Sequence, residues 1–277
     1  KPFMKKTFFL LSLSALLFQS ALAQDTIAIK PLKKVLELVI PREGGANAAS
    51  VAWHPVLKRY YAAMAGNIEF FIGAYSTTGK LLTKTDQETL FDVRGLWYNP
   101  NTKTLQMNGY GTYGWAEYKL GPNGAPASVK ILEEGSFQPD EQSVGAYDPI
   151  NKLVYFFNED GNIEKYNALT REYKEQLDLT LGYSAQEAED EIEVDNSIYI
   201  DDYNTTTVVY TGIKKAELGL LNTVNREIEL YDLETGSITR KFSLPESAPV
   251  ETALNFAYAN GIFWLFDTEA RIWKGYK

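Results

Sequence analysis

One pattern recurs five times along the chain and constrains the fold more than any other feature. In each copy an aromatic residue ends an apolar strand, one or two turn residues follow, and a second apolar strand begins. The clearest copies are Trp53-His54-Pro55, Tyr98-Asn99-Pro100 and Tyr147-Asp148-Pro149. Two weaker copies begin at Tyr203 and Tyr258, so the first aromatics lie 45 to 56 residues apart. Repeats of about 40–50 residues with several short strands are typical of β-propeller blades.

Each repeat is predicted to contain four antiparallel strands, named a to d in chain order. In the first copy, strand c is expected at residues 68–75 and strand d at residues 80–85, joined by the turn Thr77-Thr78-Gly79. The last copy has only three predicted strands. We expect residues 34–40, near the N-terminus, to supply its fourth strand, because pairing the two ends of the chain removes two open sheet edges and closes the ring.

The fold class predicted from these repeats is all-β, a single β-propeller of five four-stranded blades over residues 24–277. A six-bladed ring is the alternative, with residues 176–200 as a short extra blade. The segment Tyr231-Asp232-Leu233-Glu234-Thr235-Gly236, followed by an apolar strand at 238–244, resembles the outer hairpin of WD40-like and YVTN-like propeller repeats. The resemblance implies a repeat style and brings no catalytic residue with it.

Residues 1–23 have the features of an export signal with a short upstream extension. Lys5-Lys6 is the basic start, residues 7–18 are apolar, and Ala21-Leu22-Ala23 is a small-residue cleavage motif. We expect cleavage after Ala23 and release into the periplasm or the medium. The apolar run is short for a membrane span, so no membrane insertion is expected.

The charge and the rare residue types narrow the possible functions. The formal net charge is −9 for the whole chain and −12 for residues 24–277, which lack Lys1, Lys5 and Lys6. Such acidity disfavours nucleic acids and anionic membrane surfaces as partners. With no cysteine and a single histidine, His54, a zinc site built from these residues is excluded. Because His54 shares its repeat position with Asn99 and Asp148, we predict a turn-forming role for it and not general-base catalysis.

Three segments depart from the repeat. Residues 108–115 combine three glycines with aromatic residues, residues 186–195 are rich in acids, and residues 212–225 are expected to hold a helical turn. In a propeller, b–c turns and d–a connections emerge on the same face. Loops on a rigid scaffold often carry binding sites, so this face is the predicted functional one.

Polar residues that precede strand a are expected to surround the channel mouth on this face. They are Asn47, Asp92, Glu141, Asp195, Asn196 and Glu251. The carboxylates of Asp92, Glu141 and Glu251 are candidate metal ligands, because oxygen ligands without imidazole suit Ca²⁺ or Mg²⁺. An apolar wall beside them is predicted from Tyr110, Tyr113 and Trp115.

Two functions follow from these features. The first is an exported binding module that holds a small molecule, a glycan or a protein on the loop-decorated face. It is favoured because the sequence lacks a nucleophile motif such as G-x-S-x-G. The second is a carboxylate-dependent or Ca²⁺-assisted hydrolase, such as a glycosidase, which needs two carboxyl groups about 5–9.5 Å apart.

Overall fold

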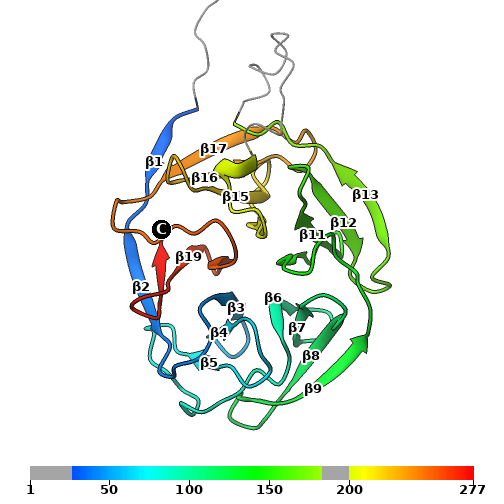
Figure 1. Cartoon of the computed structure of the whole chain (residues 1–277), viewed down its shortest axis with the longest axis vertical. Helices are drawn as coiled ribbons and strands as arrows, with labels where there is room; N and C mark the ends of the chain where they lie inside the picture. The colour runs from blue at the N-terminus through cyan, green and yellow to red at the C-terminus, as the bar shows by residue number, and fades with distance from the viewer. Residues whose placement is uncertain (1–26, 183–199) are drawn as a thin grey trace, which may run out of the picture.

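The computed structural model describes residues 27–182 and 200–277, and these fold into five sheets arranged in a ring (Figure 1). The predicted five-bladed propeller is confirmed. Residues Val144 and Thr207 of the third and fourth blades are bridged directly, which leaves no place for a sixth blade between them. The predicted export signal (1–23) and the acidic segment (186–195) lie outside the described residues.

Each blade begins with an innermost strand near the centre of the ring, such as β3 or β6, and ends at the periphery, as β9, β13 and β2 show in Figure 1. The strands of the first three blades are β3 (Ala48–His54), β4 (Arg59–Met64) and β5 (Ile72–Tyr75); β6 (Val93–Asn99), β7 (Thr104–Gly109), β8 (Trp115–Leu120) and β9 (Pro126–Glu133); β10 (Ala146–Asp148), β11 (Leu153–Phe157), β12 (Ile163–Asn167) and β13 (Tyr173–Leu177). The strands of the last two are β14 (Val209–Tyr210), β15 (Leu218–Asn222), β16 (Glu227–Tyr231) and β17 (Ile238–Ser243); β18 (Phe256–Ala259), β19 (Ile262–Asp267), β20 (Ile272–Tyr276) and β2 (Lys34–Val39).

The N-terminal segment closes the ring as predicted. Strand β2 pairs antiparallel with β20, and Leu38 on β2 is fully buried between the fifth and first blades. A second closure was not predicted: β1 (Ile29–Pro31) pairs in parallel with β17 at the outer edge of the fourth blade. One continuous segment therefore covers the outer edges of two neighbouring blades, and both edges lose their free backbone groups.

The outer strand of the first blade is less regular than the sequence predicts. Residues 80–85 form no continuous strand, and isolated bridges join Tyr75 to Leu81 and Phe71 to Glu88. The backbone N–H of Ala74 donates to the side-chain hydroxyl of Thr83 (3.2 Å), where a regular ladder would use a backbone carbonyl. Side-chain competition of this kind interrupts a strand.

The fourth blade has a different register from the predicted one. A copy that begins at Tyr203 predicts strand b at residues 208–210, but strand β14 (Val209–Tyr210) is the innermost strand of this blade. The segment 212–225 contains no helical turn: strand β15, whose residues are all buried, lies at its centre between two turns. Tyr210, and not Tyr203, therefore occupies the position of Trp53, Tyr98, Tyr147 and Tyr258 at the end of the innermost strand.

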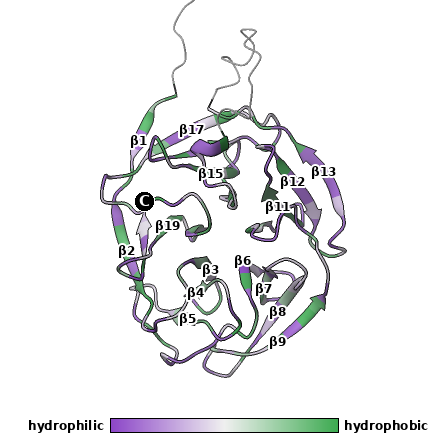
Figure 2. Ribbon diagram, in the orientation of Figure 1, coloured by the Kyte–Doolittle hydropathy of each residue, from purple (hydrophilic) through white to green (hydrophobic). Residues whose placement is uncertain are grey.

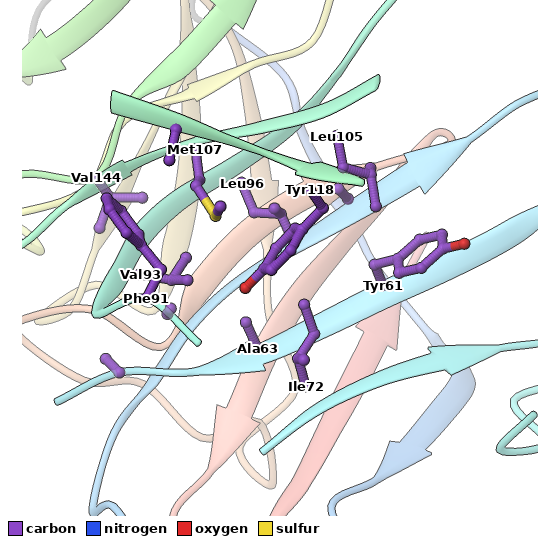
Figure 3. Packing of buried hydrophobic residues seen from close by; sticks show 14 of the residues in the cluster. Tyr61, Ala63, Ile72, Phe91, Val93, Leu96, Leu105, Met107, Tyr118 and Val144 are labelled. Atoms are coloured by element: carbon purple, nitrogen blue, oxygen red, sulfur yellow. The ribbon is translucent and has the colours of Figure 1, made fainter. Parts of the chain in front are cut away.

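Apolar side chains fill the spaces between the blades in five clusters, one for each neighbouring pair. Figure 3 shows the cluster between the first two blades, where Tyr61, Ile72 and Tyr118 meet. The buried hydroxyl of Tyr118 donates to the carbonyl of Thr89 (2.6 Å). The outermost strand β13 is exposed along most of its length and largely hydrophilic (Figure 2). In the described part of the chain, no helix has the length and apolar character needed to span a membrane.

Candidate functional site

A hydrogen-bonded turn follows the repeated aromatic residue in each of the first three blades, as the sequence predicts. The imidazole Nδ1 of His54 accepts a hydrogen bond from the backbone N–H of Leu57 (3.3 Å). Asn99 Oδ1 accepts one from the backbone N–H of Asn101 (2.9 Å), and the Asp148 carboxylate does the same for Ile150 (2.8 Å). The turn-forming role of His54 is thus confirmed. Burial lowers the pKa of its imidazole, which favours the neutral form.

Four of the predicted channel-mouth residues, Asn47, Asp92, Glu141 and Glu251, lie in the described d–a segments and bond to the protein itself. Asn47 Oδ1 accepts from the side-chain amide of Asn255 (2.9 Å). Asp92 Oδ1 accepts from the backbone N–H of Gly66 (2.8 Å) and from Arg94 Nη1 (2.6 Å). Asp195 and Asn196 fall outside the described residues.

Asp92 and Glu141 share a cluster with a residue that the sequence did not single out, Arg94. The Arg94 side chain is only 3% exposed, and its Nε donates to Gln142 Oε1 (2.8 Å). Its guanidinium carbon lies 4.8 Å from the centroid of the Tyr110 ring, and the Tyr110 hydroxyl bonds to the Glu141 carboxylate. The hydrogen bond and negative charge of Glu141 raise the Tyr110 pKa. In this cluster Asp92 pairs with Arg94, and the Glu141 carboxylate accepts a hydrogen bond from Tyr110.

The candidate calcium ligands do not meet in one group. Across residues 27–182 and 200–277, no three histidine, aspartate or glutamate side chains are placed to hold a metal ion together. Glu251 contributes its backbone carbonyl, which accepts from the side-chain amide of Asn204 (2.8 Å). The calcium site stays a prediction without a ligand cluster in this part of the chain.

Buried asparagines join neighbouring blades near this mouth. Asn204 donates from Nδ2 to the carbonyls of Glu251 and Leu254 (2.8 and 2.7 Å). Asn108 Oδ1 accepts from the backbone N–H groups of Gly95 and Gly145 (2.9 and 3.0 Å), which links the second and third blades. With Tyr210 in the aromatic position, Asn204 takes the place in the fourth blade that the sequence analysis assigned to Asp195 and Asn196.

The predicted aromatic wall is only partly present. Tyr113 is 45% exposed and packs edge-on against Phe91. Trp115 is 1% exposed and packs against Trp97 between the blades, with ring centroids 5.6 Å apart. As the first residue of β8, Trp115 has its side chain in the interblade core, so its place in an exposed wall was wrong.

An apolar cavity of about 420 Å³ occupies the opposite end of the channel, where the innermost strands end and the a–b turns begin. The aromatic residue at the same repeat position of each blade lines it: Trp53, Tyr98, Tyr147, Tyr210 and Tyr258. Trp97 and Phe256 are further aromatic lining residues. Deeper lining residues include Ser50 and Thr207. No aspartate, glutamate, lysine, arginine or histidine lies among the described lining residues. The signal for this lining in the sequence is the recurrence of an aromatic residue at the end of strand a.

Several of these aromatic side chains pack against the ring of a neighbouring side chain. The ring centroids of Trp53 and Tyr60 lie 4.7 Å apart, those of Tyr98 and His54 4.4 Å, and those of Tyr258 and Phe263 4.8 Å. Such contacts restrict the orientation of large side chains. The cavity wall is therefore preorganised, which lowers the entropy lost when a ligand binds.

A polar cavity of about 550 Å³ lies on the d–a face between the third and fourth blades. Its acidic lining residues are Asp140, Glu159, Asp160, Glu164 and Asp201. Glu164 is engaged locally, because its carboxylate accepts hydrogen bonds from Tyr166 and Asn158 (2.8 and 3.3 Å). No lysine or arginine lines the cavity among the described residues.

Solved structures resemble this ring at low sequence identity. Glutaminyl cyclase of Myxococcus xanthus superposes with a TM-score of 0.55 and 7% identity, over 91% of this chain and 98% of the cyclase. A gluconolactonase of Xanthomonas campestris gives a TM-score of 0.47 and 8% identity, over 90% and 95% of the two chains. No family model and no curated protein match the sequence. The cyclase comparison supports the propeller fold alone, and the likeness to WD40-like and YVTN-like repeats stays a resemblance.

Proposed function

We propose that the protein is an exported binding propeller that holds a ring-shaped part of a ligand, such as a sugar, in the aromatic cavity at the a–b end of its channel. The observation that carries the proposal is the placement of the repeated aromatic residue of each blade around a single cavity of about 420 Å³. Concave, mostly apolar cavities with a few polar groups are typical of small-molecule sites. This site lies on the face opposite to the one that the loop pattern favoured.

The cavity is better suited to binding than to acid–base catalysis. Its described lining residues include no carboxylate or imidazole, the groups that most often transfer protons in hydrolysis. Burial raises the pKa of Tyr147 and of Tyr258, so both phenols stay neutral at physiological pH. Neutral aromatic faces suit the C–H face of a sugar ring or a flat apolar ring, and Ser50 and Thr207 offer hydroxyl groups to a polar substituent.

Calorimetry of the protein with a panel of neutral oligosaccharides and aromatic small molecules tests the proposal. Removal of one wall in Tyr258→Ala or Trp53→Ala is expected to weaken binding by about 1 kcal/mol, roughly fivefold. Tyr173→Ala is the matched control, because Tyr173 is 52% exposed on the outer strand β13. Equal affinity of the parent and both cavity variants would show that the ligand binds elsewhere.

Export is part of the proposal and rests on the sequence of residues 1–23. Mass spectrometry of protein from the periplasm or medium should find Gln24 as the first residue. A native protein that retains residues 4–23 would contradict processing after Ala23.

A carboxylate-dependent hydrolase is the second candidate, and the acidic lining of the d–a cavity favours it. Two carboxyl groups among Asp140, Glu159, Asp160 and Asp201 would have to act as a pair. The test is glycosidase activity that is lost in Asp160→Asn or Glu159→Gln and kept in Tyr258→Ala. Activity that survives every amide substitution in this cavity would exclude it.

A further inference from the structure

We propose that the ligand of the aromatic cavity is an acidic glycan, a chain of sugars with carboxylate or sulfate groups that a ring of lysines holds over the cavity mouth. This inference deepens the proposed binding function and rests on it. Its basis is a set of positively charged lysines in the a–b turns, although the net charge of the whole chain is −9.

A lysine directly precedes strand b in three of the five a–b turns, and the longer fourth turn has Lys215 three residues before β15. Lys58, Lys103, Lys152 and Lys215 each lie three residues beyond a cavity-lining turn residue, and each has a positive φ of 51° to 61°. All four are exposed. In the fifth turn the ammonium of Lys277 takes this role, at 3.8 Å from the position that a Cβ on Gly261 would occupy. Each blade thus has a lysine in or beside its a–b turn, outside the cavity lining itself.

No ion pair within the described part of the chain uses the charge of these lysines. Basic residues with positive φ on the opposite face behave differently. Arg226 donates to the carbonyl of Glu246 (2.8 Å) and Arg271 donates to the carbonyl of Gly45 (2.9 Å), so both hold neighbouring loops in place. The lysine ammonium groups remain available to an anion.

The charges that line the two cavities also differ. The d–a face carries the acidic cavity with Asp140, Glu159 and Asp160, whereas the aromatic cavity on the a–b face has no acidic lining residue among those described. The fourth blade is the exception near the lysine ring, because Lys215 shares a hollow with Glu217 and Glu234. An anion that approaches the a–b face therefore meets Lys58, Lys103 and Lys152 with the least competition.

The aromatic cavity and the lysines together indicate the class of ligand. A cavity with aromatic walls suits a sugar ring, while the lysines of the adjoining a–b turns can pair with anionic groups outside it. A short anion would reach only one or two lysines, but neighbouring sugars of an acidic chain carry repeated charges outward from the cavity. Lysine is a compact, strongly hydrated point charge that suits carboxylate or sulfate without demanding one fixed geometry. The excess of acids on the whole chain disfavours the denser charge of a nucleic acid.

The test compares three tetrasaccharides in calorimetry at low salt: tetragalacturonate, a sulfated galactose tetramer and neutral galactotetraose. The variant is Lys58→Gln, Lys103→Gln and Lys152→Gln together. The matched control replaces three exposed lysines at the outer edges of the blades, Lys30, Lys84 and Lys130, by glutamine, which changes the net charge equally. Oligothymidine serves as a nucleic-acid probe.

We expect at least one acidic tetrasaccharide to bind the parent more tightly than the neutral one, and to bind the triple variant about tenfold more weakly. The control should match the parent, and the difference should shrink as salt screens the charges. The sulfated and carboxylated arms identify the anion. Equal binding of neutral and acidic sugars, or equal affinity of parent and triple variant, overturns the lysine inference and leaves cavity binding intact. Binding of oligothymidine alone assigns the face to nucleic acid and overturns the glycan. If no sugar binds, the glycan inference fails, and the aromatic small molecules of the first panel decide whether cavity binding stands.

Discussion

Replacement of Leu38 by alanine tests the closure of the ring most directly. Leu38 lies on β2, opposite Trp273 of β20, and none of its surface is exposed. It packs in the cluster between the fifth and first blades with Trp264 and Phe266. Leu38→Ala removes buried apolar atoms and leaves a cavity, with an expected loss of about 3 kcal/mol in the free energy of unfolding. For a chain of this size, this loss corresponds to a fall in Tm of about 6–12 °C.

Val39→Ala is the matched control, because Val39 is the next residue of the same strand and is 52% exposed. Its side chain points away from the core, so a change within about 0.5 kcal/mol is expected. Urea unfolding followed by tryptophan fluorescence measures both variants. The midpoints are compared provided that the slope of the unfolding free energy against urea concentration is unchanged. If the two substitutions lower the midpoint equally, or if neither does, strand β2 does not tie the last blade to the first and the reasoning is wrong.

Three further predictions concern the turns and the blade contacts. Asn108→Ala leaves the buried N–H groups of Gly95 and Gly145 without their acceptor and should lower stability by about 2–4 kcal/mol in urea unfolding, whereas an unchanged midpoint would refute the link between blades. Gly114→Ala should destabilise strongly, because Gly114 has φ 75° and an added Cβ would lie 2.0 Å from the Glu133 carbonyl oxygen; a parent-like Tm would contradict this turn. Burial lowers the His54 pKa below 6.5, so the folded state binds fewer protons than the unfolded state and stability should fall as pH drops below about 6.5. His54→Asn should flatten that slope in a series of melts from pH 8 to pH 5, and an unaltered slope would assign it to other groups.

Much of the fold could be predicted because its signals are local and repeated. The clear copies at Trp53, Tyr98 and Tyr147 each join an apolar strand to a polar turn, and this local chemistry was sufficient to locate strands and turns. Closure by residues 34–40 followed from counting the strands of the last copy. The weak fourth copy failed because Tyr203 and Tyr210 both end short apolar stretches. Only packing between blades three, four and five selects Tyr210 for the inner strand, while the Tyr203 hydroxyl bonds to buried Glu229 (2.6 Å).

The sequence by itself determined the propeller, its closure by residues 34–40 and the turn role of His54, because each depends on strand periodicity and short-range hydrogen bonds. The structure was needed to exclude a sixth blade. The tertiary structure alone decided which end of the channel holds the cavity. It also decided that Trp115 is buried and that Arg94 joins Asp92, Tyr110 and Glu141 in one cluster. These features depend on how side chains from different blades meet in space. A repeat marks equivalent positions in each blade, but whether such a position faces a neighbouring blade, the channel or solvent is decided when the ring closes.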